Sequence, residues 1–282
     1  MKKVMSFVLA IVSFALIASC AVPASLELDV PSLSWEEFNA AAVMPMSVDG
    51  ETRYLIEGDI LATSEEEVRA YYDTIVGNTD EGADARSGVN YIRVGKSYVF
   101  DIYNTTVRQN LTYTIDPTIS TEVRNDLVWA LDAWEAVANI HFVNVTGTST
   151  TPLFKLRNAT ASEEAAAPGV IASAFFPSYA KKELILYADF YELFSNGGLF
   201  YGWNSKSVLV HELGHGIGLR HEFIWTLTRK GWSQTGETTA KAYLLTTARD
   251  DYSIMYYPQY SAYKGNGFIS AGDITGVTRL YP

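Results

Sequence analysis

Cysteine, histidine and basic residues are all scarce in this 282-residue chain. A single cysteine, Cys20, excludes a disulfide within the chain, so the stability of the folded part must come from its core. Lys and Arg number 21 against 32 Asp and Glu, and this balance argues against a nucleic-acid-binding surface. The sequence contains no internal repeat and no coiled-coil heptads. Its length leaves room for one sizeable core and an additional amino-terminal segment.

The amino terminus has the features of an export signal. Lys2 and Lys3 precede an apolar run, Val4–Ile17, which is too short to cross a membrane comfortably. The residues Ile-Ala-Ser-Cys that follow resemble a bacterial lipobox, which predicts a signal peptide over residues 1–19 and a lipid on Cys20. An ordinary signal peptide with an incidental cysteine is the alternative. We therefore expect an exported protein, either a cell-envelope lipoprotein or a secreted one, that touches a membrane only through Cys20.

Three of the four histidines fall within eleven residues, 211–221, in the pattern H-E-x-x-H-x-x-G-x-x-H. Residues four apart share a helix face, so His211 and His215 point toward a common centre. Glu212 lies beside them, where its carboxylate can take a proton from a metal-bound water. Gly218 accepts the positive φ that ends the helix, and His221 returns as a third nitrogen ligand. Three histidines with an open fourth position predict one catalytic zinc ion per chain.

Residues beyond this motif carry a resemblance to a known family. The long motif, together with Met255 in the sequence Ser-Ile-Met-Tyr-Tyr, resembles the metzincin zinc peptidases and their Met-turn. Among the metzincins the chain is most similar to the astacins, which implies roles for three further residues. Glu222 would reach a buried region near the mature amino terminus, and Tyr257 would be a movable fifth zinc ligand that stabilises the tetrahedral intermediate. Asp59, in Ile-Glu-Gly-Asp, would bind the zinc in place of water and keep a zymogen inactive.

Each of these residues also has a structural interpretation. Met255 can be a core filler, Tyr257 is one of 18 tyrosines, and Gly58-Asp59 is a common turn dipeptide. The chain also departs from the astacin pattern, because it lacks disulfides and has Ile56 where the family motif has phenylalanine. Gly218-Leu219 likewise replaces the usual Gly-Phe. A related bacterial metzincin group is therefore an open alternative.

The remaining sequence predicts a tether and prosegment over residues 20–86 and a catalytic domain over residues 87–282. A capping-box pattern at Ser64 predicts a helix that continues to about Ile75. Residues 77–88 are rich in Gly, Asp and Asn and contain Arg86, which is typical of an exposed cleavage region or of a plain hairpin loop.

Several strands together with two main helices predict an α+β fold, with a mixed twisted sheet and a small subdomain after the motif, as the resemblance to metzincins also implies. Strands are expected near residues 97–102, 111–115, 140–145, 153–156, 169–176 and 183–188, and helices at 121–138, at the zinc motif after a cap at Asn204 or Ser205, and after Ser270. Resemblance implies that Ile171–Phe176 is an edge strand that holds an extended peptide by β-augmentation. His141 is expected to be structural.

These features predict a zinc-dependent endopeptidase that acts on proteins or peptides, with Glu212 as general base and Tyr257 assisting at the oxyanion. The alternative is a surface lipoprotein whose zinc site has a structural or adhesive role. A second alternative is an active enzyme in which Asp59 is only a turn residue.

Overall fold

The computed structural model describes residues 34–76, 92–93, 99–100, 102–222, 250–258 and 267–282. The chain divides into two compact units, Met1–Pro31 and Ser32–Pro282, and all described residues belong to the second. The predicted signal peptide with Cys20 and the whole predicted cleavage region, residues 77–88 with Arg86, lie outside the described residues. Among the helices that are described, none is long and apolar enough to span a bilayer.

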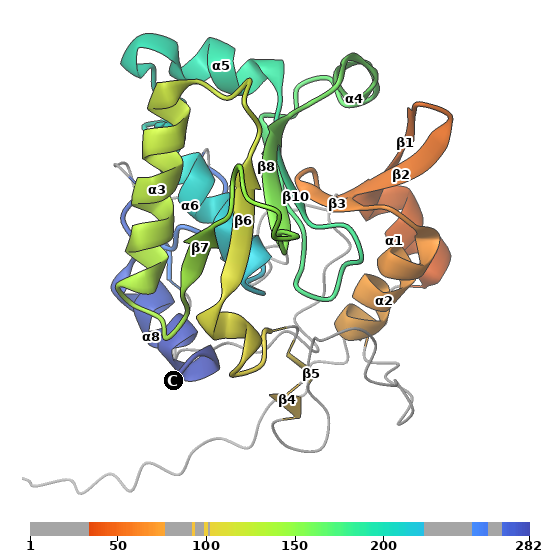
Figure 1. Ribbon diagram of the computed structural model, residues 1–282. Helices are drawn as coiled ribbons and strands as arrows, with labels where there is room; N and C mark the ends of the chain where they lie inside the picture. Colours follow the sequence, from red (N-terminus) through yellow and green to blue (C-terminus); the bar gives the residue numbers. More distant parts are fainter. Residues whose placement is uncertain (1–33, 77–91, 94–98, 101, 223–249, 259–266) are drawn as a thin grey trace, which may run out of the picture. The chain divides into compact units, whose positions relative to one another are not determined.

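The described chain contains both helices and strands in an α+β arrangement (Figure 1). The helices are α1 (Trp35–Ala42), α2 (Glu65–Val76), α3 (Thr121–Glu135), α4 (Ala161–Ala166), α5 (Ala188–Phe194), α6 (Ser205–Gly216) and α8 (Ala271–Leu280), with short 3-10 turns at Val107–Gln109 and Ser195–Gly197. The strands are β1 (Val43–Val48), β2 (Glu51–Ile56), β3 (Ile60–Ala62), β4 (Ile92–Arg93), β5 (Val99–Phe100), β6 (Leu111–Ile115), β7 (Phe142–Asn144), β8 (Phe154–Asn158), β9 (Ala172–Ser173) and β10 (Glu183–Leu186).

The central sheet has five strands in the order β7-β6-β8-β10-β9. Strands β7, β6, β8 and β10 pair in parallel, whereas β9 pairs antiparallel with β10 and forms one edge. Alternate residues of β10 face opposite sides. Leu184 and Leu186 join the main core, while Ile185 joins a second, smaller cluster on the other side. The mixed sheet and its edge strand confirm the predicted fold class.

Helices α3 and α6 pack together beneath one face of this sheet. The apolar stripe of α3 that the 3.6-residue period predicts is buried, and its Trp134 donates its indole N–H to the carbonyl of Val210 in α6 at 2.9 Å. Helix α8 starts directly after Ser270, whose side chain caps it, as the sequence predicts. Its end is tied to α6 because the hydroxyl of Tyr281 donates to the carbonyl of Ile217 at 2.8 Å.

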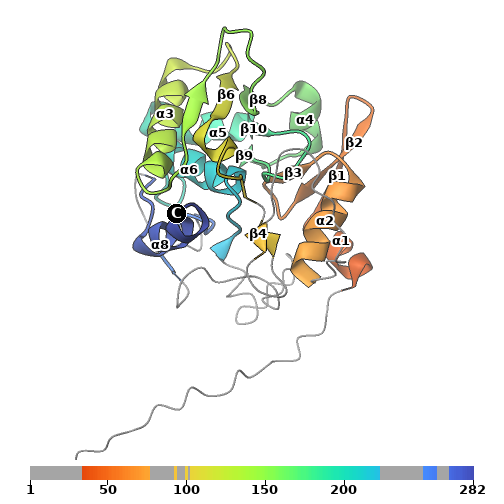
Figure 2. The same ribbon diagram turned by 60° about the horizontal axis from the view of Figure 1, so that its bottom comes forward.

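The amino-terminal segment, residues 34–76, lies beside the edge of the sheet that β9 and β10 form (Figures 1 and 2). Its strands form an antiparallel sheet in the order β1-β2-β3, flanked by α1 and α2. Ile56, Ile60 and Ala62 of this sheet join the main core. Four further buried apolar side chains share the second cluster with Ile185 of β10, namely Met46, Val48, Leu55 and Leu61. The segment therefore shares its core with the rest of the unit.

Several boundaries differ from the sequence-based expectation. Within residues 20–86, the expected tether and prosegment, the helix α1 and the strand β1 form over Trp35–Val48 without a sequence signal; Trp35 and Phe38 of α1 pack against Tyr72 of α2, and β1 contacts α4. Of the expected strand at 169–176, only Ala172–Ser173 pair with β10. Within the expected strand at 97–102, only Val99–Phe100 are a described strand, and α3 ends at Glu135 and not at the expected residue 138. Helices α4 and α5 are not expected, although Thr160-x-x-Glu163 is a capping-box pattern that signals the first.

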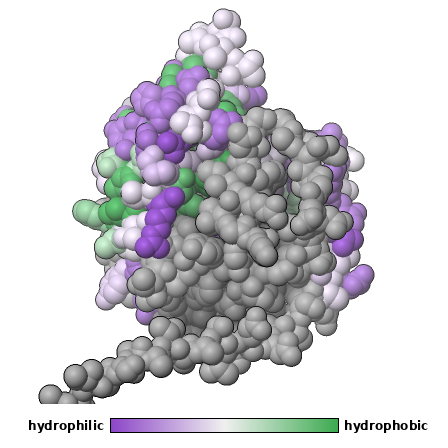
Figure 3. Space-filling view, turned by 90° about the horizontal axis from the view of Figure 1, so that it is seen from below, coloured by the Kyte–Doolittle hydropathy of each residue, from purple (hydrophilic) through white to green (hydrophobic). Residues whose placement is uncertain are grey.

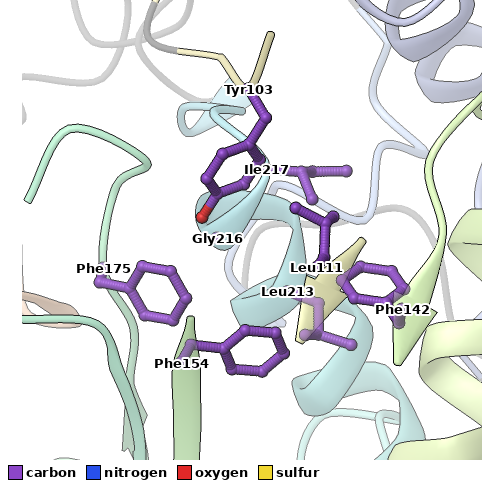
Figure 4. A pocket seen from close by; sticks show the side chains of 8 residues that line it. All are labelled: Tyr103, Leu111, Phe142, Phe154, Phe175, Leu213, Gly216 and Ile217. Carbon is purple, nitrogen blue, oxygen red and sulfur yellow. The ribbon is translucent and has the colours of Figure 1, made fainter. Parts of the chain in front are cut away.

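A small cavity lies between the central sheet and the carboxyl end of α6 (Figure 4). Its lining is apolar except for the Tyr103 hydroxyl, and includes Phe154, Phe175 and Leu213. No charged side chain points into it, so we interpret it as a packing gap. On the face seen from below, the described side chains mix hydrophilic and hydrophobic residues (Figure 3).

Candidate functional site

Helix α6 carries the first half of the eleven-residue motif, and its ends are defined by local sequence. Asn204 caps the first turn, because its side chain accepts from the amide of Ser207 at 3.1 Å. At the other end the amide of Gly218 donates to the carbonyl of His215, and the amide of Leu219 donates to that of Gly214. With φ +96° at Gly218, these bonds form a Schellman motif that turns the chain back toward the helix.

The turn brings four potential ligands together. His211, His215, His221 and Asp59 are all buried, and their nearest ligand atoms lie within 4.8 Å of one another. Nε2 of His215 is 3.2 Å from Nε2 of both His211 and His221. Oδ2 of Asp59 lies 3.0, 3.4 and 3.9 Å from the Nε2 atoms of His221, His211 and His215.

These spacings fit a zinc ion. Tetrahedral zinc with bonds of about 2.0–2.1 Å to nitrogen requires its ligand nitrogens to be about 3.3–3.4 Å apart. The 3.2 Å separations between imidazole nitrogens are close to that value. Three neutral imidazoles and one carboxylate are also a donor set that zinc accepts. The four side chains can therefore hold zinc, with the three histidines as one face of the site and Asp59 at the fourth position.

Each ring is oriented by a hydrogen bond from its other nitrogen. Nδ1 of His211 lies 2.7 Å from the carbonyl oxygen of Ile254, and Nδ1 of His215 lies 2.8 Å from that of Leu219. A carbonyl oxygen can only accept, so both Nδ1 atoms carry the proton and both Nε2 atoms present a lone pair to the centre.

Glu212 lies on α6 next to the first histidine and is almost fully buried. Its Oε2 atom has no hydrogen-bond partner among the described residues. Burial, and then the negative charge of Asp59, raise the pKa of Glu212 well above its usual value. A buried carboxylate next to the ligands, with an oxygen that no described residue engages, is placed to handle a proton at the centre.

Asp59 faces the imidazoles, and its carboxylate affects the pKa of His221 most clearly. Although burial disfavours a charged ring, the Asp59 carboxylate raises the pKa of His221 to about 9. Burial likewise disfavours the charged carboxylate, yet the facing imidazoles, His221 first, lower the pKa of Asp59. His215 behaves differently, because burial and the charge of His221 lower its pKa well below the usual value.

The chain around Asp59 pairs with the edge strand of the central sheet. The amide of Ala174 donates to the carbonyl of Asp59 at 2.8 Å, and the amide of Leu61 donates to the carbonyl of Ala174 at 2.9 Å. Ile60 and Ala174 form a parallel β-bridge just beyond β9. The edge predicted to hold a peptide is therefore occupied by the chain's own residues 59–61.

Met255 lies in a turn below α6. Asp273 accepts hydrogen bonds from the Ser253 hydroxyl at 2.6 Å and from the Ile254 amide at 2.8 Å, which holds the turn against α8. A Cβ atom added at Gly214 would lie only 2.4 Å from the sulfur of Met255, so the methionine packs directly against the helix backbone. The turn also positions the Ile254 carbonyl that orients His211.

Tyr257 and Glu222 make contacts that the sequence does not anticipate. The Tyr257 ring lies 4.8 Å from that of His221, but its hydroxyl donates to the backbone carbonyl of Glu57. Glu222 accepts from the amide of Asp250 at 2.8 Å in this intact chain. The expectation that Glu222 lies near the mature amino terminus applies to the processed form and is not tested by the intact chain.

Charged residues to which the sequence assigns no function also lie between the amino-terminal segment and the rest of the protein. Glu57 contacts His221 from the amino-terminal segment, with Oε2 3.0 Å from Nδ1. Farther away, Arg53 of β2 pairs with Glu163 of α4, which is fully buried and also binds Arg157 of β8. The capping-box pattern marks Glu163 in the sequence, but no pattern indicates its two arginine partners. His141, expected to be structural, is exposed and lies 3.3 Å from Glu135.

Comparison with known proteins gives one family match. A family model described as matrixin, a group of M10 peptidases, matches residues 104–225. This region includes α3, the five-stranded sheet and the complete motif at 211–221. No curated protein sequence matches the chain.

Solved structures show a more distant similarity. Myroilysin is 18% identical, with a TM-score of 0.42 over 62% of this chain and 93% of its own. High choriolytic enzyme 1, a hatching enzyme zinc-protease of the medaka fish Oryzias latipes, is also 18% identical, with a TM-score of 0.42 over 68% of this chain and 98% of its own.

Proposed function

We propose that this chain is a metzincin zinc metallopeptidase, and more narrowly an astacin-like endopeptidase made as a zymogen; the matrixin family model that matches residues 104–225 supports the first part. Residues 20–86 are the prosegment in this proposal, and residues 87–282 are the catalytic domain. His211, His215 and His221 are the zinc ligands, Glu212 is the general base, and Asp59 blocks the fourth zinc position. The family match names matrixins, so the astacin-like character depends on the residues around the site and not on that match.

One observation supports latency above all. Oδ2 of Asp59 lies within 3.0–3.9 Å of all three Nε2 atoms, where a catalytic water would otherwise stand. The backbone of residues 59–61 at the same time takes hydrogen-bonding positions of the edge strand at Ala174. A peptide substrate needs both places, so the intact chain excludes it from the metal and from the sheet edge.

Removal of the prosegment would make the site complete for hydrolysis. Zinc held by the three imidazoles supplies Lewis-acid polarisation and lowers the pKa of water toward neutrality. Glu212 would take the proton from the attacking water and pass it to the leaving amine nitrogen. Departure of Asp59 removes the second cause of the raised Glu212 pKa, which favours the ionised base. The edge at Ala174 would hold the backbone of an extended peptide.

Tyr257 would be released at the same step. Its hydroxyl donates to the Glu57 carbonyl in the intact chain, and Glu57 belongs to the prosegment. After processing, the hydroxyl loses this acceptor beside the His221 ring and can donate to the oxyanion of the tetrahedral intermediate. Tyr257→Phe should therefore lower kcat of the processed enzyme more than it changes KM.

Export completes the proposal. Residues 1–19 are the signal peptide, and lipidation of Cys20 anchors the enzyme in a bacterial envelope. This part is based on the amino-terminal sequence alone. Mass spectrometry of the membrane fraction would show a diacylglyceryl-modified Cys20, whereas an unmodified chain in the medium would indicate simple secretion.

Two substitutions test the enzymatic proposal. Glu212→Gln in the processed chain should retain zinc and lower the hydrolysis of a quenched peptide library by roughly 10²- to 10⁴-fold, the usual contribution of a general base. Retained activity would rule out the assigned chemistry. Asp59→Ala should make the intact chain active, with its mass monitored to exclude cleavage, while Glu51→Ala at the exposed start of β2 serves as the control. Equal activity of the intact chain, Asp59→Ala and the processed form would remove the aspartate block.

A further inference from the structure

We propose that Glu57 is a positioning residue for the third zinc ligand, so that the intact chain retains zinc more strongly than the processed enzyme. The inference rests on the proposed function, in which His221 is a ligand and residues 20–86 are removed. The prosegment would thus act in two ways: Asp59 blocks the fourth zinc position, and Glu57 orients the ligand His221.

Glu57 and Asp59 hold the two nitrogens of one imidazole. Oε2 of Glu57 lies 3.0 Å from Nδ1 of His221, and Oδ2 of Asp59 lies 3.0 Å from its Nε2. The side chains of Glu57 and His221 are both completely buried, so water does not weaken their contact. With Nδ1 donating to Glu57, the tautomer that presents the Nε2 lone pair to a metal is favoured.

The source of this acceptor separates His221 from the other two histidines. His211 and His215 donate to the carbonyls of Ile254 and Leu219, which both belong to the proposed catalytic domain. The carboxylate that His221 contacts belongs to the prosegment. Processing would therefore leave two of these three outer hydrogen bonds in place and remove the third.

The backbone at Glu57 is shaped for this contact. Glu57 has φ +55° and Gly58 has φ +98°, two successive left-handed residues between β2 and β3. A non-glycine residue in this region costs roughly 1 kcal/mol, so surrounding contacts must stabilise it. The amide of Glu57 donates to the carbonyl of Ala42 at 2.8 Å, and its carbonyl accepts from Tyr257. The turn thereby directs the side chains of Glu57 and Asp59 to the same ring.

A carboxylate that accepts from a ligand imidazole orients the ring and increases its basicity toward a metal. Mutation of such outer partners typically weakens metal binding by about 10- to 100-fold. The same loss is expected when the prosegment leaves, beyond the loss of Asp59 itself. The intact chain would thus load its metal tightly, and processing would yield an enzyme that releases zinc faster.

The rate of zinc release to a chromophoric chelator tests this idea. The zinc-loaded intact chain is compared with Glu57→Ala, Glu57→Gln and the exposed control Glu51→Ala. Glu57→Ala should release zinc about 10- to 100-fold faster, and Glu57→Gln, which keeps a neutral acceptor of the same shape, should lie between. Glu51→Ala should match the unmodified chain. A Glu57→Ala rate within twofold of the unmodified chain would overturn the inference.

A second measurement separates ligand positioning from simple loosening of Asp59. In the Asp59→Ala background, Glu57→Gln should still accelerate zinc release, because its effect passes through His221. The NMR signal of the His221 Nδ1 proton should also shift upfield in Glu57→Gln while the corresponding signals of His211 and His215 stay in place. No further acceleration in this background, together with an unshifted proton, would assign Glu57 a merely structural role and refute the proposal. An intact chain that binds no zinc at all would instead contradict the proposed function.

Discussion

Arg53 offers a direct test of how firmly the amino-terminal segment holds the site closed. Its guanidinium, on β2, pairs with the carboxylate of Glu163 on α4, where the two side chains are 11% and 0% exposed. Glu163 also binds Arg157 at 2.7 Å, and Arg157 binds Glu183 at 2.7 Å. Replacing Arg53 with methionine keeps a long side chain at the interface but removes the only one of these four charges that belongs to the segment.

The expected magnitude follows from burial and from the remaining partners. A hydrogen bond to a buried charged group contributes about 1.5–3 kcal/mol, and complete isolation of a buried ion would cost about 3–5 kcal/mol. Glu163 keeps Arg157 in the variant, so the lower range applies. Because about 1.4 kcal/mol is a factor of ten, we expect Arg53→Met to raise the population with an open segment roughly 10- to 100-fold.

Two assays measure this opening. Residual peptide hydrolysis by the uncleaved chain should rise by the same factor, and amide hydrogen exchange in β1–β3 should accelerate while α3 and α6 keep their protection. Arg53→Lys retains the charge without the planar fork and should show a smaller effect. Thr52→Met places the same new side chain on the exposed neighbouring position and should leave both measurements unchanged. Unchanged exchange and unchanged residual activity in Arg53→Met would refute the reasoning.

Three further outcomes are expected. Despite the opposing effect of burial, the Arg157 contact lowers the pKa of Glu163 from 4.5 to about 2. The ionised carboxylate therefore contributes about 3 kcal/mol to the free energy of unfolding above pH 4.5, and this contribution is lost as the pH falls toward 2. Urea unfolding at several pH values should show this loss of stability in the unmodified chain and not in Glu163→Gln. Gly214→Ala should lower the free energy of unfolding by about 1–2 kcal/mol, because the clash with Met255 exceeds the gain in helix propensity, and a stabilised variant would contradict that packing. Zinc removal should lower the melting temperature, since a ligand present at 1,000 times its Kd stabilises the folded state by about 4 kcal/mol; identical calorimetric curves with and without a chelator would show that the histidines hold no metal.

Local patterns account for the parts of the site that lie close together in the chain. The i, i+4 spacing in α6, the Asn204 cap and the left-handed turn at Gly218 all act within a few residues, and the structure shows each of them. The capping box of α8 and the apolar stripe of α3 are local in the same sense. Their energetics depend on backbone geometry, which neighbouring residues largely determine.

Other features follow from packing between distant segments. Glu57 and His221 are 164 residues apart, and Arg53 and Glu163 are 110 apart, so no spacing rule connects them. The expected strand at 169–176 pairs with β10 at only two residues, since the next residue, Ala174, bonds to the chain around Asp59. Tyr257 likewise donates to a carbonyl that only the folded amino-terminal segment brings within reach.

The sequence by itself therefore determined the metal-binding chemistry, because three imidazoles and a carboxylate at helical spacing need only one helix and one turn to converge. The tertiary structure alone decided which segment lies over the three histidines and which of its side chains contact them. Burial of apolar side chains of the amino-terminal segment in the main core and in a second cluster with Ile185, together with backbone pairing at Ala174, brings this segment over the site. Once this apolar surface is paired, the carboxylates of Glu57 and Asp59 are placed at the two nitrogens of His221, and such long-range packing leaves no periodic signal in the sequence.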